Sequence, residues 1–294
     1  MKALSILFTL TAYSSIIAQK AEPILYSVVY QFVHVKDTNN RQNQVKRDML
    51  LDIGATNAKY CNFFSEQQLK QSFKNSNVTI KPQGLKTAVG RPLVVVNSDE
   101  NSNEYFYQVP SEKKFIRFEF MAMNLYEVES TLKPINWKIK PETKTIQGYT
   151  CQKAIGTFAG RIYTAWFTTA LPFNYGPWKL WGLPGVIVEA YDIKKEVAFM
   201  CKMIIKNTDD ENLIFVSNSR SIKITEEKFV KAKHNFYQDP TSIASAAIVN
   251  KTNEEVALNY INTSGKSLTG KAAKDAIKKE SNKLINNPLE LKTP

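Results

Sequence analysis

The chain has 294 residues, of which 43% are hydrophobic and 22% are charged, and its formal net charge at pH 7 is +12. This length allows one large domain or two small ones, and the hydrophobic fraction supports a core, which excludes a globally disordered chain. The 11 glycines and 12 prolines are too few for a fibrous protein, and three cysteines are too few for a disulfide scaffold.

Residues 1–18 have the pattern of a secretory signal peptide. One lysine at position 2 precedes an apolar run that closes on small residues and ends at Ala18. The run is shorter than the ~20 apolar residues of a membrane-spanning helix, and no later run reaches that length. We therefore predict an exported chain, periplasmic or secreted, that is cleaved near Ala18 and has no transmembrane anchor.

The first half of the mature chain reads mainly as strands. Runs rich in β-branched and aromatic residues occur at 24–35, 44–53, 57–61, 104–109, 114–120 and 124–129. Within 114–120, Phe115, Arg117 and Glu119 alternate with the wholly apolar set Ile116, Phe118 and Phe120. This alternation is typical of a strand with one buried face. Between these strands, Ser65 is expected to cap a helix over 63–74, and 75–103 is a loop-rich excursion.

Residues 133–205 are the most organised part of the sequence. A hairpin is predicted to turn at Gly160, and strands are predicted at 186–192 and 197–205. Pro184 and Gly185 fit a type II turn, which would give Gly185 a positive φ. This corner is expected to deliver a central buried strand over 186–192, with its uniformly apolar face turned inward.

Helical patterns appear only after the strands. Thr225 is a candidate N-cap for a helix through 237, residues 240–270 are polar, and 271–285 form a weakly amphipathic helix. This order predicts an α+β fold, mainly antiparallel β, as a curved sheet or half-barrel with a few helices, two of them near the C-terminus. The predicted units are a signal peptide (1–18), a mainly β domain (19–239) that contains the sequence GLPG at 182–185, and a polar, partly helical extension (240–294).

No set of residues predicts catalysis or cofactor chemistry. The two histidines, His34 and His234, lie in a strand and a helix without the context of a nucleophile. The acidic runs lack calcium-loop spacing, and the cysteines lack zinc-site spacing. We therefore predict no catalytic residue, no metal and no cofactor, and the chain is more consistent with a non-enzyme. An oxidising compartment would allow a Cys151–Cys201 bridge, although three cysteines leave the pairing open.

An aromatic cluster follows the hairpin and contains three of the four tryptophans within 16 positions. Core packing is the default interpretation, because large aromatic side chains dominate core energetics. If the chain has a ligand site, we expect it here. The candidate residues are Trp166, Tyr175, Trp178 and Trp181, with Lys179 at the rim.

The basic residues are dispersed in singles and pairs, whereas nucleic-acid-binding proteins gather them on one face. We therefore predict no nucleic-acid partner. A general attraction to anionic surfaces is the expected consequence of the charge. The partner stays open between an envelope protein and an apolar or anionic ligand.

Residues 148–192 resemble the GLPGLI family, a set of exported proteins widespread in Bacteroidetes. The resemblance rests on YTCQKA at 149–154, GPWK at 176–179 and WGLPG at 181–185 in this order, with supporting pieces at 49–54 and 287–291. The structural motif consists of Gly182, Leu183, Pro184 and Gly185, and Val186 stands where the family name has Leu. The family has no established activity, so the resemblance implies export but no mechanism.

Three hypotheses follow for the function. The first is a non-enzymatic binding or assembly module of the cell envelope. The second, by analogy alone, is a carrier whose half-barrel holds a lipid or other apolar ligand, and the third is an unrecognised enzyme. A filled interior favours the module, a deep apolar cavity favours the carrier, and a polar cleft with converging titratable groups favours the enzyme.

Overall fold

The structure is a computed structural model. It describes residues 21–64, 66–67, 93–97, 104–121, 124–208, 213–215, 221–238, 257–261, 267–269, 271–273, 275–276 and 287–291. The predicted signal peptide and its cleavage position lie outside these residues, as do most of the predicted helix at 63–74 and most of the excursion at 75–103.

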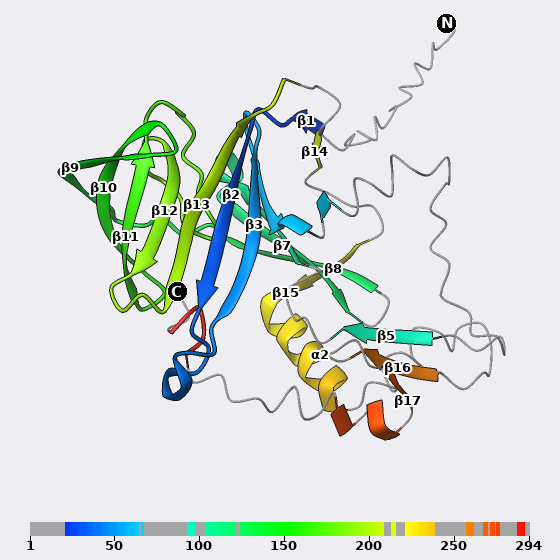
Figure 1. Ribbon diagram of the computed structural model, residues 1–294. Helices are drawn as coiled ribbons and strands as arrows, with labels where there is room; N and C mark the ends of the chain where they lie inside the picture. The colour runs from blue at the N-terminus through cyan, green and yellow to red at the C-terminus, as the bar shows by residue number, and fades with distance from the viewer. Residues whose placement is uncertain are drawn as a thin grey trace, which may run out of the picture.

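A twelve-stranded sheet forms most of the described structure (Figure 1). In order across the sheet its strands are β15 (Ile222–Thr225), β8 (Asn124–Thr131), β7 (Lys114–Met121), β6 (Glu104–Val109), β4 (Ala58–Asn62), β3 (Val45–Ile53), β2 (Tyr26–His34), β13 (Val197–Lys206), β12 (Val186–Asp192), β11 (Arg161–Thr168), β10 (Tyr149–Phe158) and β9 (Lys138–Ile146). Neighbours are antiparallel except β15 and β8. Because β9 and β15 are the two ends of this order, the sheet is curved but open, and the predicted mainly antiparallel class is confirmed.

Shorter elements complete the described structure. They are β1 (Ala21–Pro23), β14 (Leu213–Phe215), β5 (Leu93–Asn97), β16 (Ala257–Ile261), β17 (Ser267–Thr269), the 3-10 turns η1 (Thr38–Asn40) and η2 (Pro110–Glu112), and helix α2 (Glu226–Gln238). The predicted N-cap of α2 is confirmed, because Thr225 Oγ1 accepts from the Lys228 amide at 3.4 Å. Of the second predicted helix, 271–273 and 275–276 are helical and the remainder lies outside the described residues.

The main core lies on the sheet face that is covered by the loop between β11 and β12, residues 169–185. We call this the inner face. Tyr30 Oη on β2 donates to Ile187 O at 2.6 Å, where the loop enters β12. Gln108 on β6 donates from Nε2 to the carbonyls of Gly176 (2.9 Å) and Trp178 (2.6 Å). The loop therefore spans the inner face from β12 to β6, with four strands between.

The GLPG corner is built differently from the prediction. Gly182 has a φ of +91°, whereas Gly185 has no positive φ, so the predicted type II turn with a left-handed Gly185 is wrong. A Cβ at Gly185 would lie 2.1 Å from Thr168 O, because the loop returns against the end of β11. Gly185 is therefore required for close backbone approach, and Gly182 supplies the left-handed conformation.

The predicted buried strand after this corner is confirmed. β12 has neighbours on both sides, and residues 186–190 are all buried. Burial extends to both faces, however, because Ile187 is fully buried and Glu189 is 8% exposed. The alternation in the sequence therefore underestimates how completely the loop and the sheet enclose this strand.

The two cysteines of the suggested bridge lie on β10 and β13, with β11 and β12 between them. Three strand spacings correspond to about 14 Å along the sheet, against the ~7 Å between Cα atoms that a disulfide spans. Cys151 and Cys201 accordingly carry separate thiols in the structure. Burial raises the pKa of Cys151 to about 11 and that of Cys201 to about 12, so both are protonated at neutral pH.

Two glycine substitutions distinguish the two roles in the corner. Gly182→Ala should destabilise the protein by about 1–2 kcal/mol, because alanine is strained in the left-handed region although space is open around it. Gly185→Ala should cost at least about 3 kcal/mol, because the new methyl group collides with backbone. Urea unfolding of both variants measures the difference. A smaller loss for Gly185→Ala than for Gly182→Ala would contradict the close-approach role.

Candidate functional site

A groove of about 280 Å³ is open on the inner face, and we call it the inner groove. Its aromatic walls are Phe106, Phe115 and Trp178, and its charged residues are Lys36, Glu104, Arg117, Lys179, Glu226 and Glu290. His34, Ser130, Pro288 and Leu289 complete the lining. The groove therefore combines β2, β6, β7, β8, the β11–β12 loop, the start of α2 and the C-terminal segment.

A smaller recess of about 40 Å³ adjoins the inner groove. Glu104, Phe106, Trp178 and Leu289 line both spaces. The recess also contains Phe32, Arg47, Met49, Tyr60 and Phe199. The Tyr60 hydroxyl is buried and has no hydrogen-bond partner among the described residues, and Tyr60 lines the recess together with the charged residues Arg47 and Glu104.

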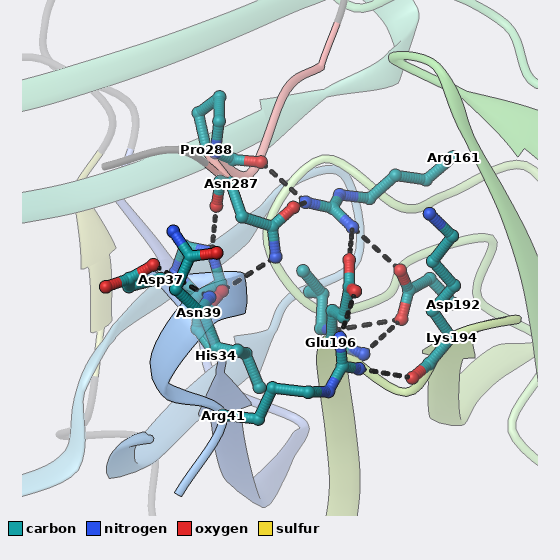
Figure 2. Close-up of polar contacts among 12 residues, drawn as sticks. His34, Asp37, Asn39, Arg41, Arg161, Asp192, Lys194, Glu196, Asn287 and Pro288 are labelled. Carbon is teal, nitrogen blue, oxygen red and sulfur yellow. Dashed lines mark hydrogen bonds and ion pairs between the residues drawn. The ribbon is translucent and has the colours of Figure 1, made fainter. Parts of the chain in front are cut away.

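The C-terminal segment 287–291 forms one edge of the groove and is held by a buried arginine (Figure 2). Arg161, at the start of β11, donates from Nη2 to Asn287 Oδ1 at 2.6 Å and to Pro288 O at 2.7 Å. Its Nε donates to Leu289 O at 3.1 Å. The Asn287 amide in turn donates from Nδ2 to Val35 O at 2.7 Å, so this segment is fixed to both β11 and the end of β2.

The charge of Arg161 is balanced by two acids, one at the end of β12 and one in the β12–β13 connection (Figure 2). Arg161 Nη1 lies 2.7 Å from Asp192 Oδ2 and 3.4 Å from Glu196 Oε2. Burial works against the charge on Glu196, but hydrogen bonds from Arg41 and Arg161 hold the pKa of Glu196 below its usual value. A buried arginine without such partners would be strongly destabilising.

His34 belongs to the same network and serves a structural purpose there. Its Nε2 lies 2.8 Å from Asn287 O, and because a carbonyl oxygen only accepts, Nε2 carries the proton. Burial lowers the pKa of His34 to about 4, so the ring is neutral at pH 7. His34 therefore supports the C-terminal segment as a neutral donor.

An ionic cluster occupies the α2 end of the groove. Arg117 on β7 pairs with Glu119 at 3.0 Å and with Glu226 at 2.8 Å, and Lys233 pairs with Glu119 at 2.6 Å. Glu104 on β6 lies opposite Glu119 on β7, and Arg117 Nη1 is 4.0 Å from Glu104 Oε1. Burial, the charge of Glu119 and a side-chain hydrogen bond with Glu119 raise the pKa of Glu104 to about 7, against the opposing effects of Lys233 and Arg117. Glu104 is thus a carboxyl group that holds a proton near neutrality.

The structure places two of the predicted ligand residues at the groove. Trp178 and Lys179 line it directly. The Lys179 ammonium pairs with Glu290 and lies 5.1 Å from the Phe115 ring centroid. The aromatic loop is thereby connected to the C-terminal segment across the groove.

The other three predicted residues lie elsewhere. Trp166 and Tyr175 are buried in the core, at 9% and 3% exposure. Trp181 is partly exposed, and its Nε1 donates to Lys133 O at 2.8 Å. These residues support the loop and do not line the groove.

Several groups at this site were not identified from sequence. Arg161, Glu104 and Tyr60 stand among ordinary strand residues, and nothing in their spacing distinguishes them. Asn287 is distinguished in the sequence only as part of the family-like ending at 287–291. The alternation at 114–120 is a usable signal, because it sets Arg117 and Glu119 on a different face from Ile116, Phe118 and Phe120.

The described residues contain neither a cluster suited to a metal ion nor a helix suited to a membrane span. No group of three or more His, Cys, Asp or Glu side chains in these ranges is placed to hold a metal ion. None of the helices in the described part of the chain has the length and apolar character needed to cross a membrane.

The segment from the β10–β11 turn to β12 matches a known family. The family described as "Protein of unknown function (Porph_ging)" matches residues 159–189, which confirms the resemblance to the GLPGLI family. Two solved structures of PNGF-II, in space groups C2 and P21, are similar at TM-scores of 0.47 and 0.46 with 14% identity, covering 71% of this chain and 32% of theirs. The chain spans about a third of the length of these structures. No curated protein matches it.

Replacement of Glu104 should change how stability depends on pH. The pKa of Glu104 is about 7 in the folded protein and 4.5 ordinarily. Between these two pH values the folded protein keeps a proton that the unfolded chain releases, so the free energy of unfolding falls as the pH rises from about 4.5 to 7. Glu104→Gln removes this titration, so the variant should gain about 2–3 kcal/mol relative to the parent across that interval. Urea unfolding at several pH values measures the gain. Glu129→Gln, which replaces an exposed acid on β8, is the control. If the free energy of unfolding of Glu104→Gln changed with pH in the same way as that of the parent, the raised pKa would be refuted.

Removal of the buried amide tests the attachment of the C-terminal segment. Asn287→Ala leaves Arg161 Nη2 and Val35 O each without one partner, and should cost about 1–3 kcal/mol. Glu290→Gln breaks only a partly exposed ion pair and should cost less than about 1 kcal/mol. Chemical denaturation compares the two. Equal losses would mean that the Arg161 network does not hold the segment.

Proposed function

We propose that the protein is an exported, non-enzymatic binding or assembly module of the cell envelope, and that its ligand site is the inner groove with its recess. Export rests on the sequence of residues 1–18. The site rests on one observation, the buried Tyr60 hydroxyl without a partner beside a groove of about 280 Å³.

A buried hydroxyl without a hydrogen bond is costly, and such groups are rare in folded proteins. Tyr60 is 3% exposed, and its hydroxyl gains a partner if a ligand places a polar atom in the recess. The aromatic walls around it supply apolar contact, and a few polar groups among apolar walls are typical of small-molecule sites. Both features support binding.

The size of the spaces favours a binding module over a lipid carrier. The loop 169–185 fills the inner face beside β12, with Leu171, Leu180 and Leu183 fully buried. The recess of about 40 Å³ is well below the ~150 Å³ of an apolar cavity that holds benzene. An acyl chain therefore does not fit the recess, whereas a small ligand fits the groove.

The chemistry of the groove supports a non-enzymatic role. Ser130 Oγ donates to Phe115 O at 3.3 Å, and His34 is bound to the C-terminal segment. Among the described groove residues, no hydroxyl or thiol is paired with a base, which nucleophilic catalysis requires. The assignment to the envelope and to Bacteroidetes rests on the family resemblance and stays part of this proposal.

Native mass spectrometry of protein purified from its own envelope tests the proposal. We expect a bound small molecule, and Ser130→Phe should abolish it because the new ring fills the groove. Thr131→Phe, at the exposed neighbouring position, should leave the ligand in place. Loss of the ligand in both variants, or its retention in Ser130→Phe, would place binding outside the groove.

A further inference from the structure

We propose, on the basis of the binding function above, that the inner groove takes a small organic carboxylate with an apolar body. The carboxylate meets Arg47 and Tyr60 in the recess, beside Glu104. The body lies between Phe106, Trp178 and Leu289. The inference concerns the chemical class of the ligand, which the existence of the groove alone does not determine.

The hydrogen-bonding groups of the recess are donors. Arg47 has five N–H donors and no acceptor, and the Tyr60 hydroxyl has a proton to give. The Glu104 carboxyl is hydrogen-bonded to Glu119 and carries no charge in its protonated form, so it does not repel an anion. A carboxylate only accepts hydrogen bonds, so it complements Arg47 and Tyr60 at once. An ammonium group would find one neutral carboxyl group and an arginine of like charge.

The charges along the groove also favour a carboxylate. Its cations are Lys36, Arg117 and Lys179, and Arg47 adds another in the recess. Glu226 and Glu290 are the opposing carboxylates while Glu104 is protonated and His34 is neutral. Among the side chains that line the groove and the recess, cations therefore outnumber anions, which favours an anionic ligand.

The dimensions restrict the body of the ligand. A volume of about 280 Å³ is at the lower end of ligand pockets, which suits a single ring or a short chain. Phe106 and Trp178 line both the groove and the recess, so an aromatic or aliphatic body attached to a carboxylate at Tyr60 contacts both rings. Leu289 brings the C-terminal segment into the same contact.

Binding of a carboxylate is expected to depend on the proton of Glu104. The groups that face this carboxyl are Glu119 and Arg117 on β7, Glu226 and Lys233 on α2, and Arg47 on β3 across the recess. Below about pH 7 Glu104 is neutral and is hydrogen-bonded to Glu119. Above that pH Glu104 adds a negative charge beside the ligand carboxylate, so binding either weakens or takes up a proton.

Isothermal titration calorimetry with three matched probes tests the class of ligand on the full chain. The probes are 3-phenylpropionate, 3-phenylpropan-1-ol and 3-phenylpropan-1-amine. At pH 6 we expect 3-phenylpropionate to bind at least tenfold more tightly than the other two. Its affinity should fall about tenfold per pH unit above pH 7, and titration in two buffers of different ionisation enthalpy should show uptake of about one proton at pH 8.

Substitutions separate a ligand role from a structural one. Tyr60→Phe keeps the ring and removes the hydroxyl, so it should weaken 3-phenylpropionate binding about tenfold without lowering the melting temperature of the free protein. Glu104→Gln removes the titrating carboxyl group, so this variant should bind 3-phenylpropionate equally at pH 6 and pH 8. Arg47→Gln should weaken binding, and Lys46→Gln, at the exposed neighbouring position, should not.

Two results would overturn the inference. Tighter binding of the amine or the alcohol, blocked by Ser130→Phe, would leave the groove as a binding site and reject the carboxylate. Binding of none of the probes at millimolar concentration would also reject it, whatever molecule co-purifies with the protein. Weaker binding by Tyr60→Phe that is accompanied by a lower melting temperature would assign Tyr60 a structural role and reject its part in the site.

Discussion

The position of the β11–β12 loop on the inner face depends on hydrogen bonds from the side chain of Gln108. Its Nε2 lies within hydrogen-bond distance of the carbonyls of Gly176, Trp178 and Leu180, at 2.9, 2.6 and 3.4 Å. Trp178 has a φ of 56°, a left-handed conformation that a tryptophan adopts only when its surroundings enforce it. A single amide from β6 thus fixes the loop that emerges from β11, on the other side of the curved sheet.

This placement of the loop determines where space remains. The loop fills the inner face near β12, and the part next to β6, β7 and α2 is left as the inner groove. The C-terminal segment, held by Arg161, forms the remaining edge. Structural and ligand-facing groups are therefore separated: the Arg161 network is saturated with partners, whereas the Tyr60 hydroxyl has none among the described residues.

The candidate site could be predicted only in part. The density of aromatic residues pointed to the loop, and Trp178 and Lys179 do line the groove. Core packing accounts for Trp166 and Tyr175, because an aromatic-rich segment supplies core and site residues alike. The sequence does not predict the raised pKa of Glu104, because this pKa depends on burial and on Glu119, which lies opposite Glu104 only through the pairing of β6 with β7.

The sequence by itself determined the strands, the helix that begins after Thr225, the mainly antiparallel class and the family resemblance, because these follow from local periodicity, capping and contiguous motifs. Only the tertiary structure decided that Gly185 is required by the approach of Thr168 O, and that residues 287–291 dock on Arg161. Such contacts join residues up to 253 positions apart. No local pattern encodes them, because each depends on how far the sheet curves and where the loop crosses it.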